Sequence, residues 1–202
     1  MIPKNVWLFG YGSLIWRPGF TYSERSPARL AGFARRFWQG SHDHRGLPHA
    51  PGRVVTLVPA TSEICVGVAY LISEDIADQV FLNLDHREKN GYRRQIVNLS
   101  LADDRVVQGL VYIASELNHA FLGPAPVSEM AQQILRSNGP SGSNREYLYN
   151  LATSLRALGA EDPHVFDLEA AVRALTESAV DTIRATAQAD PGRGTTGPQK
   201  GG

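Results

Sequence analysis

The sequence predicts one α+β domain, and three observations support this class. Runs rich in β-branched residues fill the first half of the chain, helical patterns fill the last third, and one helical pattern lies among the strands near residues 73–88. This order of elements is typical of α+β domains. A chain of 202 residues is long enough to bury a hydrophobic core without metals or disulfides. We expect residues 1–187 to form the domain.

The first element is a short buried strand, Val6 to Phe9, which runs directly into a turn. Gly10 and Gly12 flank this turn, so we expect positive φ angles there and backbone N–H groups directed toward a bound carboxylate. The segment from Trp16 to Gly19 contains a proline and excludes the helix of a dinucleotide-binding fold. Ile15 also stands where the dinucleotide motif needs its third glycine.

The next part of the chain predicts more strands. Residues 28–39 alternate loosely and predict one or two strands, and residues 40–52 predict a polar loop rich in His, Gly and Pro. Residues 53–58 and 64–72 are two β-branched runs that predict core strands. These segments supply much of the predicted sheet.

Ser73 is a plausible N-cap for the helix among the strands, because two acidic residues follow it and suit the helix dipole. Ile76, Val80 and Leu84 recur every four residues and form an apolar stripe that faces the core. If the helix continues for one more turn, Glu88 lies on the same stripe. The pattern therefore predicts a carboxylate partly withdrawn from water.

Gly91 is well placed to end that helix. Residues 95–101 and 106–113 then predict a β-hairpin whose turn lies near Asp103 and Asp104. This hairpin ends the strand-rich part of the chain.

The last third predicts helices. Residues 126–136 are helical in pattern, and residues 138–142 predict a tight turn. Ser143 and Glu146 form a capping-box pattern that starts a helix ending near residue 158.

A final helix starts at Asp162, which caps it, and Pro163, which suits the first helical position. We expect this amphipathic helix to reach about residue 184. Residues 188–202 are rich in Gly, Pro, Thr and Gln and have little to bury, so we expect a disordered tail there.

Composition excludes several function classes. Lys plus Arg equal Asp plus Glu, so the formal net charge is zero, and nothing in it draws the chain to nucleic acid or to an anionic membrane. No apolar run approaches the roughly 20 residues that span a bilayer. The N-terminal segment lacks a secretory pattern and Cys65 is the only cysteine, so we expect a soluble cytoplasmic protein that binds a small molecule. Its oligomeric state is not predictable from sequence.

Six stretches of the sequence resemble one family. They are F-G-Y-G-S-L-I-W at 9–16, R-R-F-W-Q-G-S-H-D-H-R-G at 35–46, P-G-R-V-V-T-L at 51–57, L-D-H-R-E-K-N-G-Y at 84–92, F-L-G-P-A-P at 121–126 and N-G-P-S-G-S-N-R-E-Y-L at 138–148. In this order they resemble the ChaC family of glutathione-specific γ-glutamylcyclotransferases. G-Y-G-S alone is a weak signal, whereas six matches in order are specific.

The resemblance implies a γ-glutamylcyclotransferase-like fold, a small mixed β-barrel surrounded by helices. It also implies a carbon–nitrogen lyase that converts glutathione to 5-oxoproline and Cys-Gly without a cofactor or metal. In this chemistry the α-amine of the substrate attacks its own γ-carbonyl, so the enzyme must orient the substrate and move protons.

Glu88 is the predicted general acid/base. Basic residues close in sequence would also be expected around an ordinary solvated carboxylate. The position of Glu88 on the apolar stripe nevertheless predicts a raised pKa, which suits proton transfer near neutral pH. The resemblance implies that the first turn binds the glutamyl group. The predicted substrate-binding residues are Gly10, Tyr11, Gly12, Ser13, Leu14, Ile15 and Tyr147.

Other chemistries fit the residues less well. Ser13 is not in a G-x-S-x-G elbow, and Cys65 lies mid-strand among apolar residues. His42, His44 and His49 invite a metal interpretation, but their spacing matches no closed zinc pattern. The resemblance leaves open a cavity-lining role for Asp43, His44 or Arg45. The basic and aromatic residues 35–38 favour nucleic acid only weakly, because the net charge is balanced.

One position departs from the family pattern. Some family members carry a second acidic residue nine positions before the catalytic glutamate, and Gln79 stands there in this chain. A two-carboxylate mechanism is therefore in doubt. Two alternative functions stay open, namely a cyclotransferase for other γ-glutamyl amines or amino acids, and a non-catalytic γ-glutamyl-binding module.

Overall fold

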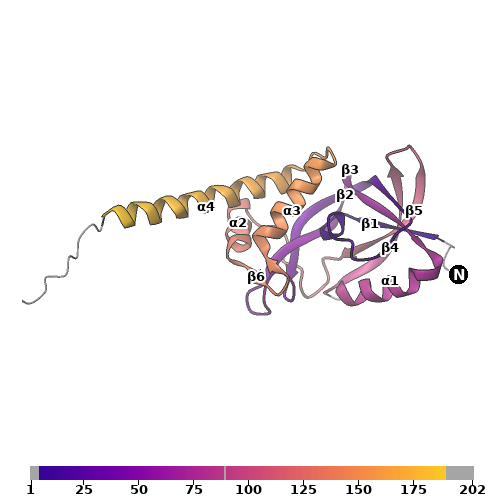
Figure 1. Cartoon of the computed structure of the whole chain (residues 1–202), viewed down its shortest axis with the longest axis horizontal. Coiled ribbons are helices and arrows are strands. Elements are labelled where there is room, and N and C mark those ends of the chain that lie inside the picture. Colours follow the sequence, from indigo (N-terminus) through magenta and orange to yellow (C-terminus); the bar gives the residue numbers. More distant parts are fainter. Residues whose placement is uncertain (1–4, 89, 190–202) are drawn as a thin grey trace, which may run out of the picture.

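Five strands form a closed β-barrel in the computed structural model, which describes residues 5–88 and 90–189 (Figure 1). The strands are β1 (Asn5–Gly10), β2 (Glu24–Ser41), β3 (Gly52–Ser73), β4 (Tyr92–Leu101) and β5 (Val106–Ala114). Around the barrel they follow the order β1-β3-β2-β4-β5. β1 closes it by pairing antiparallel with β3 and parallel with β5, so the barrel is mixed as expected.

β2 and β3 form one long antiparallel pair, and here the predicted strand count was wrong. The two runs expected at residues 53–58 and 64–72 belong to a single strand, β3. The gap between them is an irregularity in register: Ala31 pairs with Ile64, but Phe33 pairs with Pro59. Gly32 lies at this point of β2 with φ +81°. The break in the sequence pattern therefore marks a bulge that bends the strands around the barrel.

α1 (Glu74–Arg87) lies outside the barrel and begins directly after Ser73, as predicted. Ser73 occupies the N-cap position without a side-chain hydrogen bond. The inner face of the helix is buried, and it packs with β1 residues in a second hydrophobic cluster. Glu88 is the C-cap, and its backbone N–H donates to Leu84 O at 2.7 Å. Gly91 then takes φ +88° in the turn that leads to β4.

The predicted hairpin is β4 and β5, with Asp104 in the turn at φ 65°. A short segment after β1 forms the 3₁₀ helix η1 (Ser13–Ile15), and no α-helix follows β1. This confirms that the chain does not form the dinucleotide-binding turn.

The C-terminal helices are α2 (Val127–Arg136), α3 (Asn144–Ala157) and α4 (Pro163–Ala189), with the short strands β6 (Asn138–Gly139) and β7 (Gly142–Ser143) between α2 and α3. The two predicted caps are confirmed. Ser143 Oγ accepts from Glu146 N at 3.1 Å, and Asp162 Oδ1 accepts from Val165 N at 3.2 Å. α4 runs to Ala189, past the expected end, and the predicted tail from residue 190 onward lies outside the described residues.

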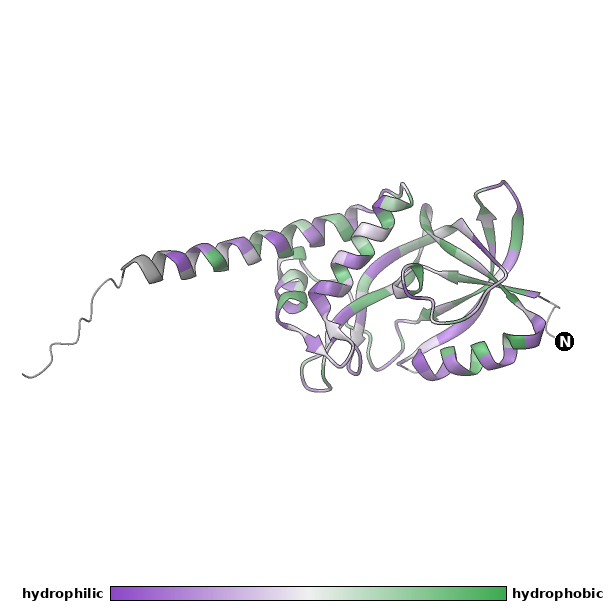
Figure 2. Cartoon of the chain, in the orientation of Figure 1, coloured by the Kyte–Doolittle hydropathy of each residue, from purple (hydrophilic) through white to green (hydrophobic). Residues whose placement is uncertain are grey.

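The main core joins the barrel interior to the helical layer. Phe9, Phe37 and Leu57 from the strands share one cluster with Leu148 and Leu168 from α3 and α4. Figure 2 shows apolar positions on the barrel strands, and apolar and polar positions that alternate along the helices. The far half of α4 extends away from this body (Figure 1).

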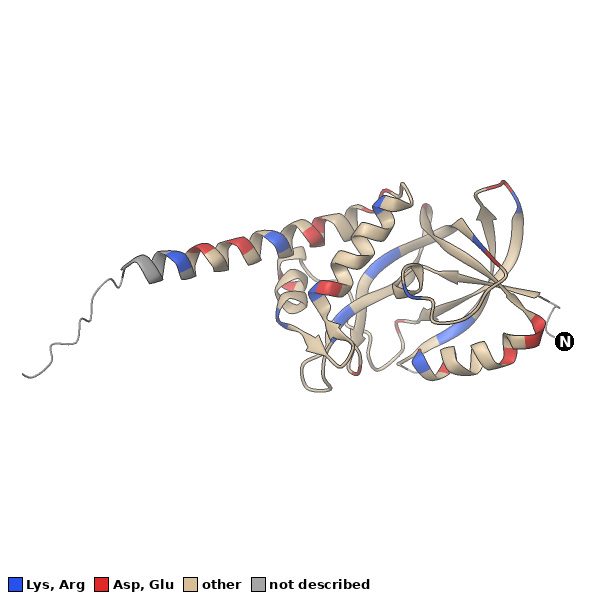
Figure 3. Ribbon diagram, in the orientation of Figure 1, with Lys and Arg blue, Asp and Glu red and all other residues tan. Residues whose placement is uncertain are grey.

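Charges are interspersed over the molecule (Figure 3). α1 carries acidic residues in its first turn and basic residues in its last turn, which complements the helix dipole. Within the described part of the chain, no helix combines the length and the apolar character that crossing a bilayer requires.

Candidate active site

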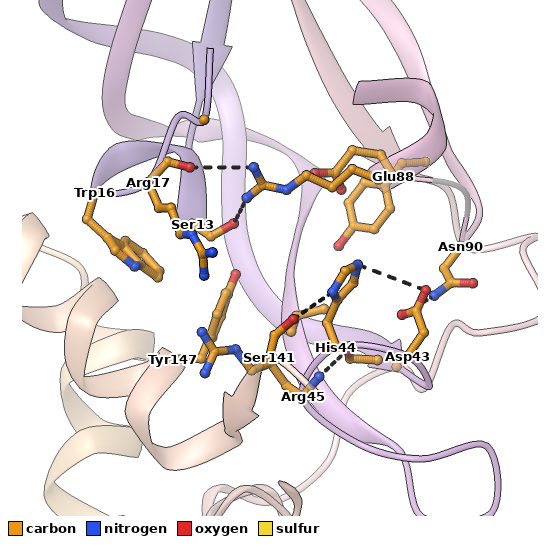
Figure 4. A pocket seen from close by; sticks show the side chains of 16 residues that line it. Ser13, Trp16, Arg17, Asp43, His44, Arg45, Glu88, Asn90, Ser141 and Tyr147 are labelled. Atoms are coloured by element: carbon orange, nitrogen blue, oxygen red, sulfur yellow. Dashed lines mark hydrogen bonds and ion pairs between the residues drawn. The ribbon is translucent and has the colours of Figure 1, made fainter. Parts of the chain in front are cut away.

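A cavity of about 360 Å³ opens beside the end of β1, where four distant segments meet (Figure 4). These segments are η1 with the loop after it, the loop after β2, the end of α1, and the start of α3. A smaller pocket of about 50 Å³ adjoins it. Ser13, Glu88, Tyr92 and Tyr147 line both spaces. The structure therefore brings the predicted acid/base and two predicted binding residues together.

Glu88 presents a largely buried carboxylate to the cavity. Its side chain is 19% exposed, and its Oε1 lies 3.5 Å from Arg87 Nε. Burial raises the pKa of Glu88, the nearby Arg87 guanidinium opposes this shift, and the Asp43 carboxylate adds to it. The result is a carboxyl group with a raised pKa at the cavity wall, as the apolar stripe predicted.

Arg87 ties the turn after β1 to Glu88. Its Nη2 donates to Ser13 Oγ at 2.7 Å, and its Nη1 donates to the backbone oxygens of Arg17 and Pro18 at 3.4 Å each. One guanidinium group therefore contacts the predicted binding turn and the predicted acid/base at the same time. The sequence reasoning missed this role, because residues 13 and 87 are far apart in the chain.

The expected positive φ angles at Gly10 and Gly12 were wrong. Neither residue has one, and Gly12 has φ −124°. Both glycines are needed for space instead. A Cβ atom at Gly10 would lie 2.7 Å from Leu14 Cβ, and one at Gly12 would lie 2.9 Å from Tyr147 Oη. The turn is thus packed too closely against its neighbours to accept a side chain at either position.

The residues of this turn separate into two groups. Tyr11, Gly12 and Leu14 line the smaller pocket, and Ser13 lines both spaces. Gly10 and Ile15 line neither space, so they belong to the turn without facing either cavity.

Tyr11 is also buried and structurally engaged. Its hydroxyl donates to Tyr112 O at 2.7 Å, and its backbone oxygen accepts from Arg35 Nε at 2.7 Å. The turn is therefore anchored to both the barrel and a buried arginine.

Tyr147 reaches the cavity from the first turn of α3. Its ring packs edge-on against Trp16 and Phe37, with centroid distances of 5.5 and 6.0 Å. The Arg45 guanidinium lies 5.7 Å from the ring centroid. Burial raises the pKa of Tyr147 to about 12, so its hydroxyl stays protonated at neutral pH and can donate a hydrogen bond.

The loop after β2 lines the opposite wall of the cavity. Asp43 Oδ1 accepts from Asn90 Nδ2 at 2.6 Å, and His44 Nδ1 lies 2.9 Å from Ser141 Oγ. Arg45 Nη1 donates to Ser143 O and to Glu146 Oε2, both at 3.1 Å. The structure thus places all three residues whose role the resemblance had left open, Asp43, His44 and Arg45, on the cavity wall.

Several further cavity residues were not singled out from the sequence. Six of them are Trp16, Arg17, Val54, Asn90, Tyr92 and Ser141. The available signal was position, because each lies inside one of the six stretches that resemble the family or directly beside one.

The alternative chemistries find little support in the geometry. Ser13 Oγ accepts a hydrogen bond from Arg87, whereas a nucleophilic serine would donate its proton to a general base. Burial in β3 raises the pKa of the Cys65 thiol to about 11. Gln79 lies on the exposed face of α1, where its Nε2 donates to Asn83 Oδ1 at 3.1 Å. Among residues 5–88 and 90–189, no three His, Cys, Asp or Glu side chains form a group that could hold a metal ion.

Comparison with known proteins gives consistent matches. The family model described as "ChaC-like protein" matches residues 6–175. Gamma-glutamylcyclotransferase 2-3 of Arabidopsis thaliana is 47% identical over 191 residues, covering 90% of this chain and 96% of the relative. Glutathione-specific gamma-glutamylcyclotransferase 1 of Homo sapiens is 41% identical over 169 residues, covering 81% of this chain and 76% of the relative.

Solved structures agree with these sequence matches. The crystal structure of a yeast gamma-glutamyl cyclotransferase specific to glutathione superposes with a TM-score of 0.80 at 34% identity, covering 84% of this chain and 96% of that chain. A structure titled gamma-glutamyl cyclotransferase has a TM-score of 0.51 at 14% identity, over 82% of this chain and 87% of that chain, and supports the fold alone.

Proposed function

The chain belongs to the ChaC family and has the γ-glutamylcyclotransferase fold that its sequence predicts; from this premise we propose that it cleaves glutathione to 5-oxoproline and Cys-Gly. The observation that carries the proposal is the largely buried Glu88 carboxylate at the wall of a cavity of about 360 Å³. A cavity of this size accepts a tripeptide.

The proposed reaction requires proton transfer but no nucleophile from the protein, because the substrate supplies the attacking nitrogen. The substrate α-nitrogen attacks the γ-carbonyl carbon, a C–N bond forms to close the lactam, and the γ-amide C–N bond breaks. The α-nitrogen goes from three hydrogens to one, while the cysteinyl nitrogen goes from one to three. Two protons therefore move between these nitrogens, and no water is consumed.

Glu88 is the proposed carrier of both protons. As a carboxylate it accepts one proton from the α-ammonium group before attack, and as an acid it gives this proton to the departing nitrogen. The attacking nitrogen, positively charged once the C–N bond has formed, gives up its second proton to the departing amine by the same route. The pKa of Glu88 is raised by burial, which brings it closer to neutral pH and favours transfer in both directions.

The turn after β1 is the proposed binding site for the γ-glutamyl group. The smaller pocket lies between this turn and Glu88, so a glutamyl group held there has its α-amine close to the base. Tyr147 has a protonated hydroxyl at the same place and can donate to the γ-carbonyl oxygen as negative charge develops on it. Holding the folded conformer of the substrate supplies much of the acceleration.

Replacing Glu88 with Gln tests the assignment. Glutamine keeps the size of the side chain but cannot exchange protons, so 5-oxoproline release from glutathione should fall by about 10²- to 10⁴-fold while the fold is retained. Asp78→Asn is a matched control, because it removes a carboxylate from the exposed face of the same helix. Near-normal turnover in Glu88→Gln would reject the proposed role.

A comparison of two substrates tests which γ-glutamyl compounds the protein accepts. Comparing glutathione with γ-Glu-Ala shows whether contacts beyond the scissile amide matter, and we expect the tripeptide to react faster. Equal rates would favour the broader class of γ-glutamyl substrates, and binding without 5-oxoproline release would establish a binding module. We place the activity in the cytoplasm, where reduced glutathione is abundant and a lone cysteine is ordinary.

A further inference from the structure

Three arginines line the cavity, and two of them already have acceptors within the protein. Arg87 donates to Ser13 Oγ and lies beside Glu88. Arg45 is buried, and it donates to the Glu146 carboxylate and to a backbone oxygen. Both guanidinium groups therefore already face a carboxylate of the protein, Glu88 for Arg87 and Glu146 for Arg45.

Arg17 is the exception among these three. It lines the cavity and is exposed, and within the described part of the chain its side chain has no hydrogen-bond or ion-pair partner. Figure 4 shows the side chain directed into the cavity. An unpaired guanidinium group at the wall of a binding cavity is suited to a carboxylate from the ligand, which it can bind through two parallel hydrogen bonds.

The backbone of Arg17 is fixed although its side chain is free. Its N–H donates to Ser13 O at 2.8 Å, and its carbonyl oxygen accepts from Arg87 Nη1 at 3.4 Å. Pro18 follows, and its oxygen accepts from the same nitrogen. The charged group therefore extends from a point that is held at a constant place relative to Glu88.

Glutathione carries two carboxylates, and the chemistry distinguishes them. The α-carboxylate is bonded to the same carbon as the attacking nitrogen, so it must lie near Glu88 and hence near Arg87. The glycyl carboxylate lies at the other end of the tripeptide, beyond the cysteine. We propose that Arg17 binds this glycyl carboxylate and selects substrates with a charged C-terminus, an inference that rests on the proposed function.

The test compares two substrates in two enzymes. The substrates are glutathione and its glycinamide analogue, in which the terminal carboxylate is a neutral amide, and the enzymes are wild type and Arg17→Gln. Wild type should prefer glutathione by about 10- to 100-fold in kcat/KM, the range for a charge-assisted hydrogen bond. In Arg17→Gln, kcat/KM for glutathione should fall by this factor, mainly through a higher KM. The kcat/KM for the analogue should change little.

Two controls sharpen the comparison. Arg29→Gln removes an exposed arginine outside the cavity and should leave both substrates unchanged. Arg17→Lys keeps the charge and should restore part of the preference for the acid.

The possible outcomes separate the inference from its premise. If kcat/KM falls equally for both substrates in Arg17→Gln, the residue contacts the glutamyl end or supports the fold. If kcat/KM falls for neither substrate, the residue does not take part in binding. Either result overturns the inference. Release of 5-oxoproline by wild type keeps the proposed function in either case. Absence of 5-oxoproline with both substrates would overturn the proposed function and this inference together.

Discussion

Arg87 and Glu88 are sequence neighbours with opposing effects at the site. Burial raises the pKa of Glu88, and the Arg87 guanidinium, 3.5 Å from Oε1, lowers it. The arginine thus limits how far burial can push the carboxyl group toward its neutral form. A base that were protonated throughout the neutral range could not accept a proton from the substrate ammonium.

Replacing Arg87 with Gln should therefore move the acidic limb of the pH profile of kcat/KM to higher pH. The variant loses a positive charge next to Glu88, so the pKa of the carboxyl group rises and a higher pH is needed to ionise it. Activity at neutral pH should fall about tenfold or more, because the contact with Ser13 is lost as well.

The measurement is the rate of 5-oxoproline release between pH 5 and 9. Arg93→Gln removes an exposed arginine that does not line the cavity, and its profile should match wild type. If the acidic limb of the pH profile stays in place in Arg87→Gln, or moves to lower pH, the electrostatic role of Arg87 is contradicted.

At the scale of elements, the start of α4 is docked on β2 by a neutral histidine. His164 Nε2 accepts from the backbone N–H of Phe37 at 3.0 Å. Burial lowers the pKa of His164 to about 4, and the charge of Arg36 adds to this effect. A protonated ring could not accept the hydrogen bond, so the contact exists only in the neutral form.

This contact predicts a loss of stability on mild acidification. The pKa of His164 is lower in the folded chain than the usual value of 6.5, so the unfolded chain binds more protons between pH 6.5 and 4. The stabilisation is complete above pH 6.5 and declines as the pH falls toward 4, by up to about 2 kcal/mol at pH 5.

Urea unfolding at pH 7 and pH 5 measures this effect. His164→Gln keeps an acceptor for Phe37 N–H without a titrating ring, so it should lose less stability than wild type between the two values. Equal losses in the two proteins would assign the pH dependence to other groups.

Local signals in the sequence were sufficient to predict the ends of several elements. Ser143 and Asp162 cap α3 and α4 as expected, because capping depends on residues only three positions apart. Whether 53–58 and 64–72 form one strand or two depends on the register with β2, which is a long-range property. A pattern of residue types does not contain that information.

The same limit explains which candidate site residues the sequence could indicate. Glu88 was predicted because its helix places it on an apolar stripe, and Tyr147 because it follows a capping box inside a family motif. Arg87 was missed because its contacts join η1 to the end of α1, two segments that are far apart in the sequence. Gly12 was identified for the wrong reason, since its close neighbour, Tyr147, is more than a hundred positions away.

At the scale of the whole molecule, one buried arginine joins the barrel, the turn after β1 and the helical layer. The Arg35 side chain is 1% exposed, and its Nη1 pairs with Asp162 Oδ2 at 2.6 Å. Its Nε donates to Tyr11 O at 2.7 Å, and its Nη2 donates to Val66 O. Asp162 is the carboxylate that pairs with Arg35, so removing it would leave a buried cation without compensation.

Asp162→Ala should lower the free energy of unfolding by about 3 to 5 kcal/mol, because it leaves Arg35 unpaired and also removes the cap of α4. Asp162→Ser separates the two effects, since serine can still cap the helix but carries no charge. Urea unfolding should show that the serine variant retains most of the defect. Wild-type stability in Asp162→Ser would mean that the ion pair contributes nothing net.

The buried position of Cys65 has a consequence for the proposed reaction, whose substrate carries a thiol. It is the chain's one cysteine, it is 3% exposed, and its pKa of about 11 leaves almost no thiolate at neutral pH. Thiol–disulfide exchange requires an accessible thiolate. Cys65 is therefore a poor partner for a mixed disulfide with oxidised glutathione, and we expect this oxidant to leave the thiol unmodified.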